Sequence, residues 1–169
     1  MSSEEGSSKE SSRVTIPPDI TPDHVLGLIE ALYSLGGSID PMYIGDAIGE
    51  NIRLLPHIID LAEAMKLITY REGVLTLTDF GKRVVRENTK MVKKLLRSVA
   101  ANLEPIREIV SILKNKGFLT IDEYRDIICK TYPQNFEEAY RHVLLWGAFL
   151  RLFKMSDDDK LILPIDLNI

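Results

Sequence analysis

The chain has 169 residues, of which 45% are hydrophobic and 27% charged, and its formal net charge is -4. This hydrophobic content can fill a core and excludes a disordered chain, while the negative charge excludes a general attraction to phosphate backbones. The sequence contains no run of about 18 apolar residues that could span a bilayer, and no secretory signal. We therefore expect a soluble cytoplasmic protein without membrane insertion.

The first 20 residues differ in composition from the rest of the chain. Residues 1–13 are rich in Ser, Glu and Gly and contain almost nothing that could be buried. Ordering them would cost conformational entropy without a compensating gain. We predict that residues 1–20 form a disordered N-terminal tail.

A first folded unit is predicted over residues 21–87. Apolar residues recur at helical spacing at its start, and Gly36-Gly37 ends this first helix. A short extended segment then leads to a second short helix over 41–48, which begins with a proline in its first turn. Gly49 is predicted to end the second helix.

The third helix is predicted over 54–66, where the apolar residues form one face. Two β-prone runs at 67–70 and 74–77 flank a short loop that contains a glycine, a pattern typical of a hairpin. A capped helix follows from about residue 79. A long connecting helix is predicted within 88–103.

This order of helix, short strand, helix, helix and hairpin is typical of a winged helix, a helix-turn-helix variant with a β wing. The same order recurs over residues 104–169. Its helices are predicted over 106–116, 122–130 and 135–148, and its strands over 118–120, 149–155 and 160–164. The sequence thus predicts a mainly α protein with small β-hairpins, made of two tandem winged-helix units.

Several short motifs follow one another at characteristic intervals along residues 22–163. They are Val25-Leu26-Gly27-Leu28-Ile29-Glu30-Ala31-Leu32, Gly36-Gly37, Leu54-Leu55-Pro56-His57-Ile58-Ile59-Asp60-Leu61-Ala62-Glu63, Leu75-Thr76-Leu77-Thr78-Asp79-Phe80-Gly81, Trp146-Gly147 and Leu152-Phe153. With these motifs the sequence resembles the C-terminal AAA-associated domain. That module is found behind the ATP-binding cassette of nitrate-, sulfonate- and taurine-type transporter ATPases, and also as a separate protein.

The resemblance implies a fold more strongly than an activity. It implies a stand-alone helper of ABC-type ATPase machinery, which acts in trans where its relatives are fused to the cassette. The sequence departs from the fused form because it contains no Gly-x-x-x-x-Gly-Lys-Ser/Thr motif, so ATP binding of that kind is not expected. The family module offers no catalytic residues to transfer onto this chain.

No constellation in the sequence predicts an enzyme, a metal site or a cofactor. His24, His57 and His142 lie far apart and are predicted to be surface or helix-end residues. Cys129 is the single cysteine, which excludes an intramolecular disulfide and a thiolate-clustered zinc site, and we predict that it is a buried hydrophobic residue. Asp157-Asp158-Asp159 lacks the spacing of a calcium loop and is predicted to be a solvated turn.

Nucleic-acid binding is the alternative function, because the third helix of a winged helix normally enters the major groove. The candidate contacts are Arg53, His57, Lys66 and Arg71. Nearby carboxylates make these elements nearly neutral, and three aspartates occupy the tip of the second wing. Since binding to phosphates depends on protein cations, the charge pattern disfavours this function.

The strongest basic patch lies on the predicted connecting helix, where Lys90, Lys93, Lys94 and Arg97 share one face through three- and four-residue spacing. We predict that this face contacts an acidic partner surface, with nucleic acid or plain solvent as alternatives. The apolar side of the helix can pack within its own chain or against a second copy, so a homodimer remains open.

Aromatic residues crowd the second unit, and we predict that most of them belong to the core. If a part of this group is exposed, it is a candidate protein-binding hot spot. The residues are Tyr124, Tyr132, Phe136, Tyr140, Trp146, Phe149 and Phe153. The sequence as a whole favours a non-catalytic regulatory or protein-interaction module, with an ABC-type ATPase as a candidate partner, over a winged-helix DNA-binding transcription regulator.

Overall fold

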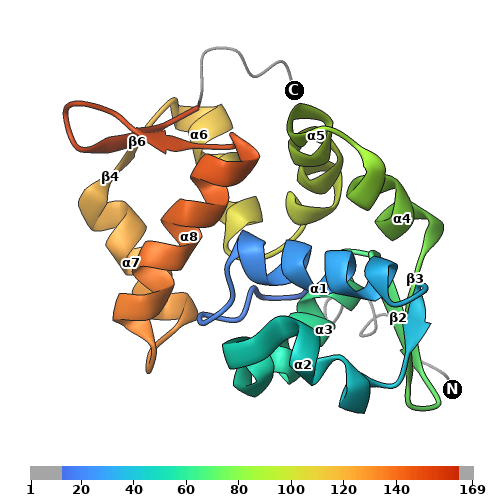
Figure 1. Cartoon of the computed structure of the whole chain (residues 1–169). Helices are drawn as coiled ribbons and strands as arrows, with labels where there is room; N and C mark the ends of the chain where they lie inside the picture. The colour runs from blue at the N-terminus through green and yellow to red at the C-terminus, as the bar shows by residue number, and fades with distance from the viewer. Residues whose placement is uncertain (1–12, 164–169) are drawn as a thin grey trace, which may run out of the picture.

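The computed structural model describes residues 13–163, apart from the side chains at 46–47 and 49–51. This part of the chain is mainly helical and contains two three-stranded antiparallel sheets. Figure 1 shows two lobes, one formed by the blue to green residues of the N-terminal half and one by the yellow to red residues of the C-terminal half.

The N-terminal half contains three helices, two 3-10 helices and one sheet. In chain order these are α1 (Pro22–Ser34), β1 (Ser38–Ile39), η2 (Pro41–Tyr43), α2 (Gly45–Ile48), η3 (Gly49–Leu54), α3 (Leu55–Ala64), β2 (Ile68–Arg71) and β3 (Val74–Leu77). The last strand, β3, lies between β1 and β2. Glu72 and Gly73 form the turn between β2 and β3, and both have the positive φ that tight hairpin turns favour.

The C-terminal half repeats this arrangement. Its elements are α6 (Ile106–Lys116), β4 (Leu119–Thr120), α7 (Ile121–Thr131), α8 (Phe136–Leu150), β5 (Lys154–Met155) and β6 (Lys160–Ile162). Again the last strand, β6, lies between the other two. The chain also turns through a left-handed residue shortly after α3 and after α8, at Lys66 and Arg151. The two halves therefore share element order and strand order.

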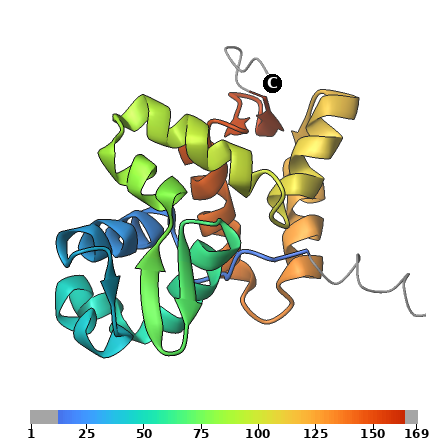
Figure 2. The same ribbon diagram turned by 90° about the vertical axis from the view of Figure 1, so that its right-hand side faces the viewer.

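Two helices connect the halves, α4 (Asp79–Arg86) and α5 (Thr89–Ala100). Both helices have a capping residue at their start, Thr78 for α4 and Asn88 for α5. The side chain of each accepts a hydrogen bond from a backbone N–H of the first turn. The stripe of α5 formed by Val92, Leu96 and Ala100 is buried. In Figure 2, α5 (yellow-green) lies above the β2–β3 hairpin.

One hydrophobic core runs through both halves. Its central element is α8, because this helix contacts α1 and α5 of the N-terminal side as well as α7. The largest fully buried side chains, Trp146, Tyr124 and Phe153, belong to the C-terminal half. Tyr132 is buried too, whereas the aromatic residues Phe136, Tyr140 and Phe149 are only partly buried.

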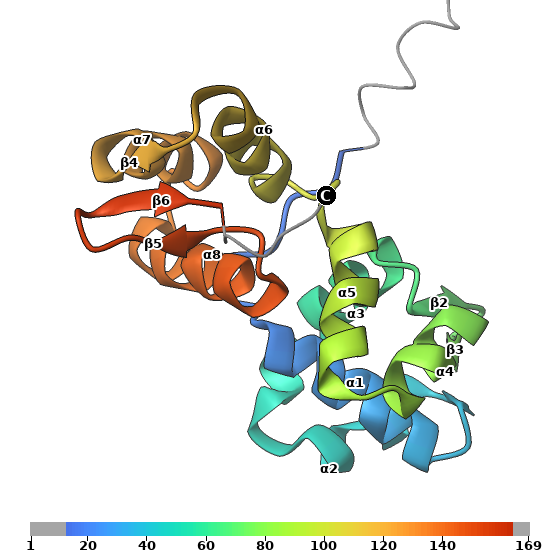
Figure 3. The ribbon, with the colours of Figure 1, turned by 90° about the horizontal axis from the view of Figure 1, so that it is seen from above.

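The prediction of a disordered tail over residues 1–20 is wrong for its second part. Residues 13–20 run between the two lobes, as the blue segment in Figure 3 shows, and Ile16 and Ile20 are buried. The Ile16 N–H donates to the Glu104 carbonyl oxygen at 2.9 Å, and the Tyr132 hydroxyl donates to the Ile16 carbonyl oxygen at 2.5 Å. These partners lie far away in the sequence, so local composition gives no sign of them. Residues 1–12 lie outside the described part, as do residues 164–169 of the predicted second unit.

Three further predictions are corrected by the structure. The second helix, predicted over 41–48, is divided into η2 and α2; α2 does end before Gly49, but η3 follows it directly. The strand predicted over 149–155 exists only as β5, because α8 extends to Leu150 before the left-handed Arg151 ends it. Cys129 is exposed, since the buried positions of α7 are those of Tyr124, Ile127 and Ile128.

Candidate functional site

Half of the basic face predicted on α5 contacts the end of α8. Lys93 and Arg97 are only partly exposed. The Lys93 Nζ atom lies 5.2 Å from the centre of the Phe149 ring, and Arg97 Nη1 lies 3.5 Å from the Leu150 carbonyl oxygen. A cation is favourable here because the last carbonyl groups of a helix carry partial negative charge and an aromatic ring attracts cations. Lys93 and Arg97 therefore hold α5 against the end of α8.

The other half of this face is exposed and continues onto α4. Lys90 and Lys94 of α5 are exposed, as are Arg83 and Arg86 of α4. These four residues form what we name the basic ridge. The two arginines have surface partners nearby, while the two lysines have no hydrogen bond or ion pair within residues 13–163. The cations of Lys90 and Lys94 are thus available to a partner.

The predicted nucleic-acid contacts are all exposed, but one of them is engaged. Arg53, Lys66 and Arg71 are open to solvent. The Nδ1 atom of His57 lies 2.9 Å from the carboxylate of Asp19, so this histidine pairs with the N-terminal segment. Because His57 is paired with Asp19, three residues of the predicted set, Arg53, Lys66 and Arg71, are left to contact a phosphate backbone.

The outward face of α3 is acidic. This helix contains Asp60 and Glu63, both exposed, and no lysine or arginine. The Glu63 carboxylate also accepts a hydrogen bond from the Tyr70 N–H at 3.1 Å, which ties it to β2. Because phosphates repel carboxylates, a helix with this face is poorly suited to lie in a DNA groove.

The three histidines, predicted to be surface or helix-end residues, all contact residues 18–21, the segment that leads into α1. His142 of α8 donates from Nδ1 to the Pro18 carbonyl oxygen at 2.7 Å, and His57 of α3 pairs with Asp19. In α1, His24 Nδ1 accepts a hydrogen bond from the Thr21 N–H at 2.9 Å. Burial, and after it the nearby His142, lowers the pKa of His24 below its ordinary 6.5. Nothing in the sequence indicated this convergence.

The motif from Leu75 to Gly81 organises the start of α4. The Thr78 hydroxyl accepts a hydrogen bond from the Gly81 N–H at 3.0 Å, and it lies 2.7 Å from the Lys66 carbonyl oxygen. A Cβ atom at position 81 would lie 2.2 Å from the Leu67 carbonyl oxygen. Glycine is therefore needed because α4 starts directly against the chain that leaves α3.

The Trp146-Gly147 motif joins three parts of the molecule. The Trp146 indole nitrogen donates to the Ile20 carbonyl oxygen at 2.8 Å. A Cβ atom at position 147 would lie 2.0 Å from the Phe153 ring, so only glycine lets the chain before β5 pack onto α8. Both motifs thus serve the core, and neither places a reactive group at the surface.

Sequence reasoning predicted no contact for two exposed arginines, Arg125 of α7 and Arg141 of α8. Each directly follows a tyrosine, Tyr124 or Tyr140. The repeated Tyr-Arg dipeptide on two amphipathic helices was the available sign, because packed tyrosines bring the following residues near each other.

The described part of the chain contains no cluster of three or more His, Cys, Asp or Glu side chains that could hold a metal ion. Within the same residues, no helix has the length and apolar character that crossing a membrane requires.

Comparison with curated proteins gives a distant relative. The chain is similar to trimethylamine corrinoid protein 2 of Methanosarcina acetivorans, with 24% identity over 125 residues, which cover 73% of this chain and 54% of that protein. The chain thus spans about half the length of this curated relative. No solved structure matches the chain.

The family comparison agrees with the motifs from Leu54 onward. The model of the C-terminal AAA-associated domain matches residues 42–156, which include α3, the Thr78 cap and the Trp146-Gly147 pair. This range is more than half of the chain. The protein therefore belongs to the C-terminal AAA-associated domain family.

Proposed function

We propose that this protein is a non-catalytic interaction module, built from two winged-helix units, that acts together with an ABC-type ATPase. The winged-helix assignment is supported by the order of elements and by the strand order of the two sheets, which place the short first strand beside the last strand of the hairpin in both halves. The family membership supports the link to an ATPase. Such a partnership would keep the protein in the cytoplasm.

The proposal depends mainly on the charge of α3, the helix that would enter the major groove in a DNA-binding winged helix. Asp60 and Glu63 face outward on α3, and His57 is engaged by Asp19. A DNA-binding unit gains affinity by neutralising phosphates with cations, and this face has none of its own. A protein surface is therefore the more suitable partner.

The basic ridge is the proposed contact for an acidic surface of that partner. Lys90 and Lys94 project from a helix that is held in place by its buried stripe and by Lys93 and Arg97. Long-range attraction between this ridge and carboxylates would speed and orient association. The two lysines can be changed without touching the contacts to α8, which makes a clean test possible.

The test is affinity purification of the tagged chain from its native cells, with and without nuclease, followed by mass spectrometry and by sequencing of bound nucleic acid. We expect an ABC-type ATPase subunit to remain bound after nuclease treatment. The variant Lys90→Glu/Lys94→Glu should lose this subunit. The control Lys114→Glu/Lys154→Glu reverses two exposed lysines on α6 and β5 and should retain it.

Two results would contradict the proposal. Equal capture by the ridge variant and the control would remove the basic ridge from the interaction. Recovery of discrete DNA fragments, with all protein partners lost after nuclease treatment, would instead establish a DNA-binding regulator that uses Arg53, Lys66 and Arg71.

A further inference from the structure

A pocket of about 380 Å³ opens to solvent between α7 and α8. It is lined by Arg125 from α7 and by Phe136, Glu137, Tyr140 and Arg141 from α8. This volume falls within the range of about 300–1,000 Å³ that is typical of ligand sites. Two arginines beside two aromatic rings suit a ligand that carries both negative charge and an apolar group.

The walls of the pocket are fixed by contacts between tyrosines. The rings of Tyr124 and Tyr140 meet edge to face, with centroids 4.9 Å apart, and Phe136 lies 5.6 Å from Tyr140 on the same helix. The Tyr124 hydroxyl also donates to the Tyr140 carbonyl oxygen at 2.6 Å. Because an arginine follows each tyrosine, this contact brings Arg125 and Arg141 to the same opening.

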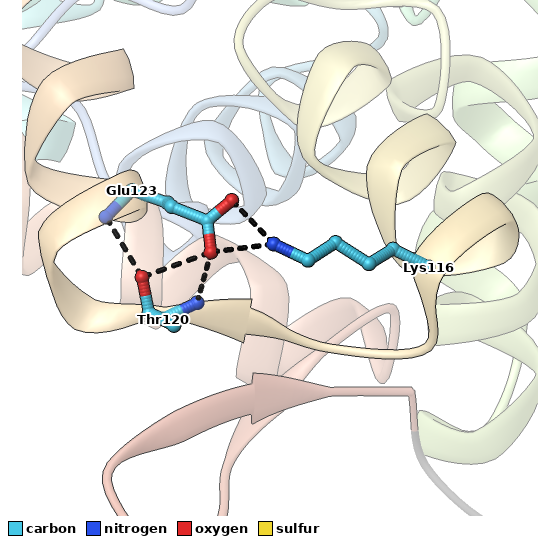
Figure 4. A network of polar contacts seen from close by, with 3 residues as sticks. All are labelled: Lys116, Thr120 and Glu123. Atoms are coloured by element: carbon cyan, nitrogen blue, oxygen red, sulfur yellow. Dashed lines mark hydrogen bonds and ion pairs between the residues drawn. The ribbon is translucent and has the colours of Figure 1, made fainter.

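A second network fixes the start of α7. Figure 4 shows the Thr120 hydroxyl and the Glu123 carboxylate in a reciprocal cap, with Lys116 beside the carboxylate. Glu123 accepts from the Thr120 N–H at 3.2 Å and from Lys116 Nζ at 2.8 Å. Glu123 directly precedes the Tyr124-Arg125 pair. The helix that presents Arg125 is thus anchored two residues before this arginine, so little ordering would be needed on binding.

The arginines of this pocket have no ion pair in the described part of the chain. The Tyr140 hydroxyl also has no hydrogen-bond partner there. Glu137 is the single carboxylate of the lining, so the lining carries one net positive charge. Two guanidinium groups and one hydroxyl are therefore available as donors at one opening.

We infer that this pocket binds an acidic segment of a protein partner, with an aromatic side chain over Phe136 and Tyr140 and its neighbouring carboxylates on Arg125 and Arg141. The inference rests on the proposed function, since it identifies a second contact of the same interaction module. An extended occupant is favoured over a compact ligand because a further apolar side chain of α8 is exposed beyond the pocket. Leu145, one turn after Arg141, is 47% exposed.

Nucleic acid suits this surface less well. The exposed carboxylates Asp122 and Asp126 lie on the same helix as Arg125, and the first turn of α8 contains Glu137 and Glu138. A phosphate backbone would have to approach these charges along its length. A short peptide can instead place two carboxylates on the arginines alone.

The test uses the purified, isotope-labelled chain and the peptide acetyl-Gly-Asp-Phe-Asp-Gly-amide, with binding followed by changes in amide NMR shifts. We expect saturable changes at Arg125, Phe136, Tyr140 and Arg141. Replacing both aspartates of the peptide with asparagine, or its phenylalanine with alanine, should weaken binding at least about tenfold, because charge-assisted hydrogen bonds and buried rings each contribute that much.

The variant Arg125→Gln/Arg141→Gln should also bind at least about tenfold more weakly, whereas the control Arg53→Gln/Arg71→Gln should bind like the parent. If the first variant does not fold, Arg125→Lys/Arg141→Lys keeps the charge but loses the planar fork and should show an intermediate affinity. Unchanged binding by the glutamine variant overturns the inference, as does the absence of saturable shifts. A 20-base-pair duplex that binds the pocket more tightly than the peptide overturns it in favour of nucleic acid. None of these outcomes depends on capture of an ATPase, so the pocket and the basic ridge can fail separately.

Discussion

The indole nitrogen of Trp146 lies 2.8 Å from the carbonyl oxygen of Ile20, although 126 positions separate the two residues in the sequence. Both are fully buried. The hydrogen bond ties the N-terminal segment to the central helix α8, close to the contacts that Tyr132 and His142 make with Ile16 and Pro18.

Replacing Trp146, the donor of this hydrogen bond, should leave the Ile20 carbonyl oxygen without its partner. We expect Trp146→Phe to lower the free energy of unfolding by at least about 1–3 kcal/mol, because a buried acceptor then loses its hydrogen bond. Urea denaturation measures this change. Tyr70→Phe, at an exposed position of β2, should change stability by less than about 0.5 kcal/mol. Equal effects of the two substitutions would show that the bond to Ile20 is unimportant.

A methyl group at Gly147 has no room. Gly147→Ala should destabilise the protein by about 1–3 kcal/mol, because the new Cβ overlaps the Phe153 ring. Phe153→Leu in the same chain should relieve part of the overlap, so that the double variant loses less than the sum of the two single variants. Gly27→Ala is the control, since no atom lies within 4 Å of its Cβ. A Gly147→Ala protein as stable as the parent would disprove the close packing of α8 and Phe153.

Thr78 should act through its hydroxyl. Thr78→Ala is expected to destabilise the protein by about 0.5–2 kcal/mol, because the first turn of α4 loses its cap and the chain after α3 loses a donor. Thr78→Ser restores the hydroxyl and should recover most of the loss. Thermal unfolding of the three proteins decides the matter, and a serine variant as unstable as the alanine variant would argue against capping.

His24 should make stability depend on pH. Its pKa is lowered in the folded protein, first by burial and then by His142, so the unfolded chain binds a proton more readily. The contribution of His24 is therefore complete above pH 6.5 and is lost as the pH falls below that value toward the lower folded pKa. Protonation at Nδ1 would also break the hydrogen bond from the Thr21 N–H.

The matched variant is His24→Gln, because glutamine at this position can still accept from the Thr21 N–H but does not titrate. When the pH is lowered from 7.5 to 5.5, the urea concentration at the midpoint of unfolding should fall further for the parent than for this variant. Other titrating groups act in both proteins and cancel in the comparison. A parent and a variant with the same pH dependence would show that His24 does not control stability in this range.

Most helices, the hairpins and the family could be predicted from the sequence. Apolar spacing, caps such as Thr78 and breakers such as Gly117 act over a few residues, and the structure has helices and strands close to the predicted places. The motifs around Thr78 and Trp146 also led to the family that the comparison supports. These features can be predicted from the sequence because each depends on local backbone geometry.

Which side chains share a surface depends on the tertiary structure. It buried Ile16 and Ile20 of the predicted tail, exposed Cys129, and turned Lys93 and Arg97 of the predicted contact face onto α8. It also gathered residues separated by many positions, as in the Tyr124–Tyr140 contact that places Arg125 beside Arg141. Burial and pairing of this kind depend on how helices rotate and pack against each other, and local periodicity does not contain that information because one helical pattern is compatible with many partners.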